Sequence, residues 1–140
     1  MGTGPATYLA STHKIGGLIL FSPFLSLQEA AKDMVGSVLG FFVNDRFVNR
    51  ERIQKVNSPI IIIHGEKDTI IPIRHARELF QLINVNVEKR LYTPEKMDHN
   101  EFEYYQDFLE PVQLFLEHFL NEISLSYIDP EAFMVCKEGI

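Results

Sequence analysis

Four consecutive isoleucines, Ile60–Ile63, constrain the fold more than any other feature of the sequence. β-Branched side chains favour strands. An apolar run without polar alternation is typical of a strand that is buried on both faces of a parallel sheet. Residues 18–21 (Leu-Ile-Leu-Phe) form a second run of this kind, which ends at Ser22-Pro23. Because parallel strands need crossover connections, the two runs predict an α/β fold.

The segments around these two runs complete that fold. Residues 85–92 alternate between apolar and polar side chains and predict a third strand. Residues 28–42 predict a helix or lid that is interrupted by Gly36 and Gly40. Helices are expected over residues 6–13, 49–56, 74–83 and 101–123, with Asn49 capping the second and Pro111 kinking the last.

Composition limits the class of protein. The chain has 140 residues, enough for one domain, and 46% of them are hydrophobic, as in ordinary globular proteins. The net charge of −6 argues against nucleic acid or an anionic membrane surface as the main partner. No apolar run reaches the roughly 20 residues of a membrane-spanning helix, and no signal peptide is visible, so we expect no membrane anchor in this chain.

Metal and cofactor chemistry is not expected. Cys136 is the single cysteine, which excludes an internal disulfide and a multi-cysteine zinc site. A zinc site can be drawn from four side chains, but their spacing matches no metalloprotease pattern. Those four side chains are His64, Asp68, His75 and His99.

An acid and a histidine follow two of the predicted strands. Asp68 comes shortly after the isoleucine run, and His99 comes 31 residues later, after the third strand. This separation leaves room for one helix and one strand, which return the chain to the same edge of the sheet, where active sites of parallel sheets lie. A carboxylate that accepts a hydrogen bond from an imidazole fixes its tautomer and stabilises the imidazolium, so the imidazole can act as a general base.

These two loops resemble those of a known superfamily. The strand followed by His-Gly-Glu-Lys-Asp at 64–68 and Ile71-Pro72 is similar to the acid loop of α/β hydrolases, and the Asp-His-Asn-Glu-Phe segment at 98–102 resembles their histidine loop. The resemblance implies the C-terminal half of an α/β-hydrolase fold over residues 1–123, with about three parallel strands and flanking helices. A tail over residues 124–140 is expected to follow. It also implies that Asp68 is the acid and His99 the base of a catalytic triad.

The N-terminus adds a more specific resemblance. The run Gly-Thr-Gly-Pro-Ala-Thr-Tyr-Leu-Ala-Ser at 2–11, with Ser-Pro-Phe after the next strand, resembles the protein-depalmitoylase branch of the α/β hydrolases. Aligned with the G-x-S-x-G elbow of that family, Gly2 is the last glycine, and the nucleophilic serine would lie one position before Met1. The backbone N–H of Met1 would then stand for an oxyanion donor.

The resemblance implies a function for the intact protein. It would be a serine hydrolase of esters or thioesters, such as the thioester of a palmitoylated protein, and the present chain would be inactive alone. The partner would be an acylated small molecule or protein, and no cofactor is implied. Location would be cytoplasmic, at the cytoplasmic face of a membrane for the intact protein. The sequence carries no signal for the oligomeric state.

Several alternatives stay open at this point. Asp68 suits a turn, Asp98 is a rival acid next to His99, and His64 suits a role in satisfying backbone groups. His75 begins a helix at the same rim and is a candidate to line the substrate site. Four serines are possible replacement nucleophiles, although none sits in a G-x-S-x-G elbow: Ser11, Ser22, Ser26 and Ser37.

Two other hypotheses concern the chain as a whole. It is either a non-catalytic pseudoenzyme that binds a partner through the uncovered edge of strand 18–21, or an incomplete gene product that starts at an internal methionine. The presence of both Asp68 and His99 argues against a pseudoenzyme. Met1 falls where the family has an apolar residue, which favours the incomplete gene product.

Overall fold

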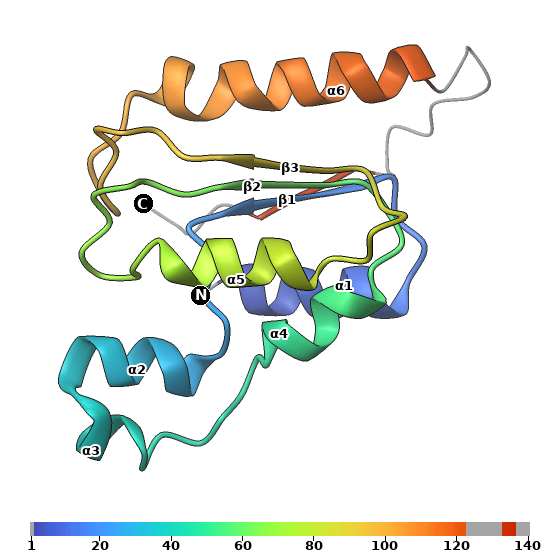
Figure 1. The fold of residues 1–140 in the computed structure, drawn as a ribbon. Helices are drawn as coiled ribbons and strands as arrows, with labels where there is room; N and C mark the ends of the chain where they lie inside the picture. The colour runs from blue at the N-terminus through green and yellow to red at the C-terminus, as the bar shows by residue number, and fades with distance from the viewer. Residues whose placement is uncertain (1, 123–132, 137–140) are drawn as a thin grey trace.

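A computed structural model of the chain describes residues 2–122 and 133–136 (Figure 1). One parallel sheet of four strands forms the centre, in the order β3-β2-β1-β4. The predicted α/β class and the two apolar strands are confirmed. The strands are β1 (Gly17–Phe21), β2 (Ile60–Ile63), β3 (Lys89–Tyr92) and β4 (Phe133–Cys136).

The two apolar strands supply both faces of the core. Leu18 pairs with Ile60 and Leu20 with Ile62, and these side chains face one layer of helices. The alternate residues of both strands face the opposite layer, where they pack against Phe108, Val112 and Phe115. Because both faces are covered, every residue of β1 and β2 is buried, which explains the absence of polar alternation in their sequences.

Helices lie on both faces of the sheet, as Figure 1 shows. On one face are α1 (Thr3–Thr12), α4 (Asn49–Arg52) and α5 (Arg74–Leu82). On the other face is α6 (Glu110–Glu122). Within the described ranges, no helix is long and apolar enough to cross a bilayer.

A lid segment, residues 26–43, follows β1 and lies apart from the sheet (Figure 1). It contains α2 (Leu27–Val35) and α3 (Ser37–Gly40). The predicted interruption at Gly36 is observed, and its φ of +88° is a conformation that glycine adopts without strain. Six large apolar side chains of this segment are exposed: Met34, Val35, Val38, Leu39, Phe41 and Phe42.

Two local predictions need correction. Asn49 does not cap a helix: α4 begins at Asn49, Val48 precedes it, and no side-chain hydrogen bond caps it. The buried Asn49 amide instead donates to the carbonyl of Phe24, 2.9 Å away, which ties the two segments together. A short 3₁₀ segment, Ile53–Lys55, follows α4.

The last helix also differs from the prediction. It begins at Tyr104 rather than at residue 101, and its first six residues, Tyr104–Leu109, are π-helical. The winding becomes α-helical at Glu110, beside Pro111, which lacks the backbone N–H that a regular helix would use. The predicted irregularity near Pro111 is therefore present as a change of helix type.

The fourth strand was not predicted from the sequence. β4 lies in the segment that we expected to be a tail, and it pairs in parallel with β1 from Gly17↔Phe133 to Leu20↔Cys136. The outer edge of β1, which we expected to be uncovered, is thus hydrogen-bonded. A boundary between domain and tail at residue 123/124 stays a prediction.

Candidate active site

The acid loop begins where β2 ends and holds Asp68 in a turn. One carboxylate oxygen of Asp68, Oδ1, accepts hydrogen bonds from the backbone N–H groups of Ile70 (3.0 Å) and Ile71 (2.8 Å). Asp68 favours a turn for this reason, since its side chain pairs with the backbone two and three residues on. The turn directs the second oxygen, Oδ2, away from the backbone and toward the histidine loop.

Asp68 and His99 meet at the carboxyl edge of the sheet, as their positions after β2 and β3 predict. Oδ2 of Asp68 lies 2.8 Å from Nδ1 of His99. The Asp98 carboxylate contacts the backbone N–H of His99 instead. Because the carboxylate is an acceptor, the proton of the neutral imidazole lies on Nδ1 and the basic lone pair lies on Nε2.

The surroundings of Asp68 keep it ionised. Burial opposes the charge, but hydrogen bonds from His64, from His99 and from the backbone N–H of Ile71 outweigh burial and hold the pKa of Asp68 well below its ordinary value. The Asp68 side chain is fully buried, whereas that of His99 is 16% exposed. A permanent carboxylate therefore lies behind a histidine that solvent can reach.

The acid and histidine loops are joined through their backbones. The Glu66 N–H donates to the carbonyl of Pro94, and the Lys67 N–H donates to that of Met97. The nitrogen–oxygen distance is 3.1 Å in both hydrogen bonds. Gly65 allows this approach, because a Cβ at this position would lie 2.1 Å from the Met97 oxygen. This role of Gly65 was not predicted from the sequence, although a glycine directly after His64 was the available signal.

Comparisons with known proteins show what the chain is similar to. No protein-family model matches the chain. Alpha/beta hydrolase domain-containing protein 17C of Xenopus tropicalis is 33% identical over 118 residues, which are 84% of this chain and 36% of the relative. Protein 17B of the same series, from Homo sapiens, is 34% identical over 116 residues, 83% of this chain and 38% of the relative.

A solved structure shows the same fold. Acetyl xylan esterase 1 from Thermoanaerobacterium sp. superposes with a TM-score of 0.61 at 13% identity, covering 84% of this chain and 43% of the esterase. The chain has an α/β-hydrolase fold. It spans about a third of the length of the curated relatives that it matches.

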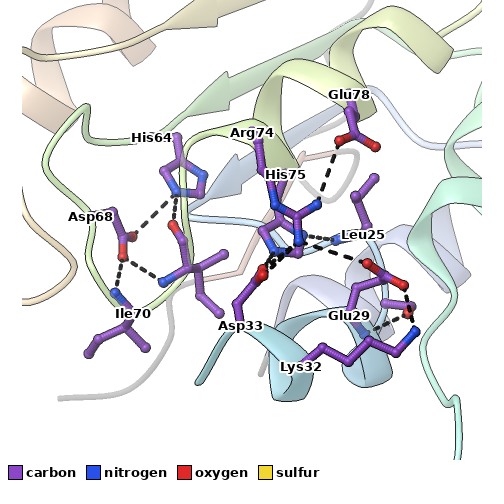
Figure 2. Close-up of polar contacts among 12 residues, drawn as sticks. Leu25, Glu29, Lys32, Asp33, His64, Asp68, Ile70, Arg74, His75 and Glu78 are labelled. Carbon is purple, nitrogen blue, oxygen red and sulfur yellow. Dashed lines mark hydrogen bonds and ion pairs between the residues drawn. The ribbon is translucent and has the colours of Figure 1, made fainter. Parts of the chain in front are cut away.

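His75 of this α/β-hydrolase chain lies below the surface rather than at the open rim that we expected, and its role in lining the substrate site stays a prediction. Its side chain is completely buried. The Leu25 N–H donates to Nδ1 (3.1 Å), and Nε2 lies 2.6 Å from Oδ2 of Asp33, as Figure 2 shows. Asp33 on α2 also accepts two hydrogen bonds from Arg74, at 2.7 and 2.8 Å. These contacts fasten the lid segment to the start of α5.

The other predicted site features have mixed outcomes. Met1 lies outside the described residues, so its oxyanion role stays a prediction. Within those residues, no group of three or more His, Cys, Asp or Glu side chains is placed to hold a metal ion. Two hollows of about 440 and 560 Å³ lie elsewhere, and neither is lined by Asp68 or His99.

Ser22 is an unusual residue at the same edge of the α/β-hydrolase sheet. It directly follows β1, its φ is +46°, and its buried hydroxyl has no hydrogen-bond partner among the described residues. A positive φ in a residue other than glycine carries backbone strain. The Ser22-Pro23 pair predicts a turn but contains no signal for this strain.

Proposed function

We propose that this chain is the C-terminal part of a serine hydrolase of esters or thioesters, with Asp68 and His99 as its acid and base. The observation that carries the proposal is the 2.8 Å contact between Asp68 Oδ2 and His99 Nδ1 at the carboxyl edge of a parallel sheet. The kinship with α/β hydrolases adds a family in which such a pair serves a serine nucleophile.

The proposed reaction has two halves. A serine from the segment preceding Met1 attacks the acyl carbon while Nε2 of His99 takes its proton, and that proton then goes to the leaving thiolate or alkoxide. In the second half, His99 takes a proton from water while the water oxygen attacks the acyl carbon. The bond from the acyl carbon to the serine oxygen then breaks, and His99 returns the proton to that oxygen, which releases the acid and regenerates the serine. The Asp68 carboxylate stabilises the imidazolium in both halves.

The proposed substrate is a protein at the cytoplasmic face of a membrane that carries an acyl chain attached through a thioester. Support comes from the resemblance of residues 2–11 to the depalmitoylase branch. The lid segment adds physical support, because its exposed large apolar side chains suit an acyl chain or a lipid surface better than water.

The test compares this chain with a longer protein. The coding sequence directly upstream of the Met1 codon is expected to encode Gly-x-Ser in frame. The longer product should react with a fluorophosphonate probe and hydrolyse an acyl thioester, whereas the 140-residue chain should do neither. Stoichiometric serine labelling and turnover by the 140-residue chain would overturn the proposal, as would an in-frame stop codon just upstream with transcripts that begin at Met1.

A further inference from the structure

His64 is a second histidine next to the acid, and its environment fixes its tautomer. The side chain is completely buried at the end of β2, with Nε2 2.7 Å from the carbonyl oxygen of Ile71. Oδ2 of Asp68 lies 3.4 Å from the same nitrogen. Both neighbours are acceptors, so Nε2 must carry a proton, because a lone pair there would face two oxygens.

The other ring nitrogen agrees with this assignment. Nδ1 of His64 is buried without a hydrogen-bond partner among the described residues. A proton at Nδ1 would be an unpaired buried donor, which is costly. The neutral ring with its proton on Nε2 therefore leaves the smaller unsatisfied group, a lone pair, in the core.

The proton on Nε2 closes the acid loop. His64 and Ile71 are the two ends of this loop, and the 2.7 Å hydrogen bond joins them. Ile71 in turn donates its N–H to Oδ1 of Asp68. The His64 imidazole thus fixes the carbonyl of Ile71, whose N–H in turn binds the Asp68 carboxylate. The same imidazole N–H also makes a second, longer contact with Oδ2 of Asp68.

We propose that His64 is a positioning residue, which keeps the carboxylate of Asp68 turned toward Nδ1 of His99. The inference rests on the proposed function only in naming this pair as catalytic. Neither the role of Asp68 nor that of His99 requires a second histidine at the end of β2. A leucine would fill similar space there but would leave the carbonyl of Ile71 and Oδ2 of Asp68 without this donor.

The first measurement uses the unmodified 140-residue chain. Long-range ¹H–¹⁵N correlation spectra report which nitrogen of each imidazole carries the proton. We expect the proton of His64 on Nε2 at neutral pH. A proton on Nδ1 would overturn the inference without any variant having to fold.

The second measurement follows the pH at which the His99 ring titrates. A carboxylate in contact favours the imidazolium, so Asp68→Asn should lower this midpoint by about one pH unit or more. His64→Leu should lower it by roughly half as much, since the carboxylate stays but loses its orientation. His64→Gln, whose amide N–H can replace Nε2–H, should restore most of the shift. A folded His64→Leu chain with the midpoint of the unmodified protein would overturn the inference.

His75→Leu is the matched control, because His75 is the other completely buried histidine. It should lower stability without moving the His99 midpoint, and an equal shift there would overturn the inference by showing general loosening. The readout is separate from hydrolysis. If His99→Ala left the longer protein active, the proposed function would fail, while the titration would still test the role of His64.

Discussion

His99 and His75 each lie at hydrogen-bond distance from a carboxylate, at 2.8 Å from Asp68 and 2.6 Å from Asp33. His99 uses Nδ1 for this contact and is partly exposed. His75 uses Nε2, its Nδ1 accepts the N–H of Leu25, and its side chain is completely buried. A histidine–carboxylate pair therefore does not by itself indicate a function. The first pair, Asp68 and His99, presents a basic nitrogen at a sheet edge, while the second pair, Asp33 and His75, fastens the lid segment to α5.

The electrostatic surroundings of His75 and Asp33 agree with a structural role for this second pair. Burial is the main reason that the pKa of His75 lies below its ordinary value, and the nearby Arg74 adds to the lowering. For Asp33, burial opposes ionisation, but hydrogen bonds from Arg74 and His75 prevail and lower its pKa. The neutral form of His75 is thus favoured, and because both of its ring nitrogens are occupied inside the protein, it fastens the two segments and presents no free nitrogen for proton transfer.

The largest expected effect would separate the pairs by activity. In the longer protein, Asp68→Asn and His99→Ala should each reduce kcat/KM for a thioester by roughly a thousandfold or more, since each removes part of the general-base machinery. His75→Ala should reduce it far less. Circular dichroism would check that each variant folds. Near-normal hydrolysis by the His99→Ala protein would show that the comparison assigns the wrong histidine.

A second effect concerns the backbone that supports the first pair. Gly65→Ala places a methyl group against the Met97 carbonyl, so the acid and histidine loops must separate. We expect the free energy of unfolding to fall by about 2–3 kcal/mol, as for other overpacked sites. Chemical denaturation measures this loss, and NMR should show perturbed signals at His99 but unchanged signals at His75. Equal perturbation of both histidines would contradict the separation between the two regions.

A third effect would break the second pair. Asp33→Asn removes the charged acceptor of Arg74 and His75, and we expect a loss of about 1–2 kcal/mol in the free energy of unfolding. His99→Ala is the matched change in the first pair and should cost less, because Asp68 keeps its hydrogen bonds from the backbone of Ile70 and Ile71, whereas Asp33→Asn weakens contacts to both Arg74 and His75. Denaturant titrations of both variants give the comparison. A greater loss in His99→Ala would mean that the first pair carries more of the stability.

The smallest effect is a pH dependence that belongs to the second pair. The pKa of His75 in the folded chain lies below its ordinary value of 6.5, so the unfolded chain binds this proton first as pH falls. Stability from His75 is therefore present above pH 6.5 and is lost as pH falls through the lowered value. His75→Gln should flatten the decline in thermal midpoint below pH 6.5. An unchanged slope would exclude His75 as its source.

The sequence predicts the first pair and misses the second for a physical reason. Asp68 and His99 each follow a strand, and parallel strands deliver their ends to one edge, so sequence position nearly determines proximity. Asp33 and His75 come together only through the path of the lid segment, which depends on how Gly36 and Gly40 let α2 and α3 turn and pack. No periodic pattern encodes that path.

Other features escaped the sequence analysis because they are pairwise contacts. The clash that a side chain at Gly65 would make with Met97 depends on how the two loops approach each other. β4, like β1, is a short apolar run, so its sequence allows a strand but does not say which edge of the sheet the strand joins.

Because β4 pairs with β1, no other strand can occupy that edge of β1 at the same time. β1 has two edges, and β2 takes one of them while β4 takes the other. Any further strand brought to this edge of β1 must displace β4 and take over its hydrogen bonds. Tethering in the same chain gives β4 a high effective concentration. Assembly at this edge is therefore a strand exchange, whose equilibrium is set by the difference between two pairings.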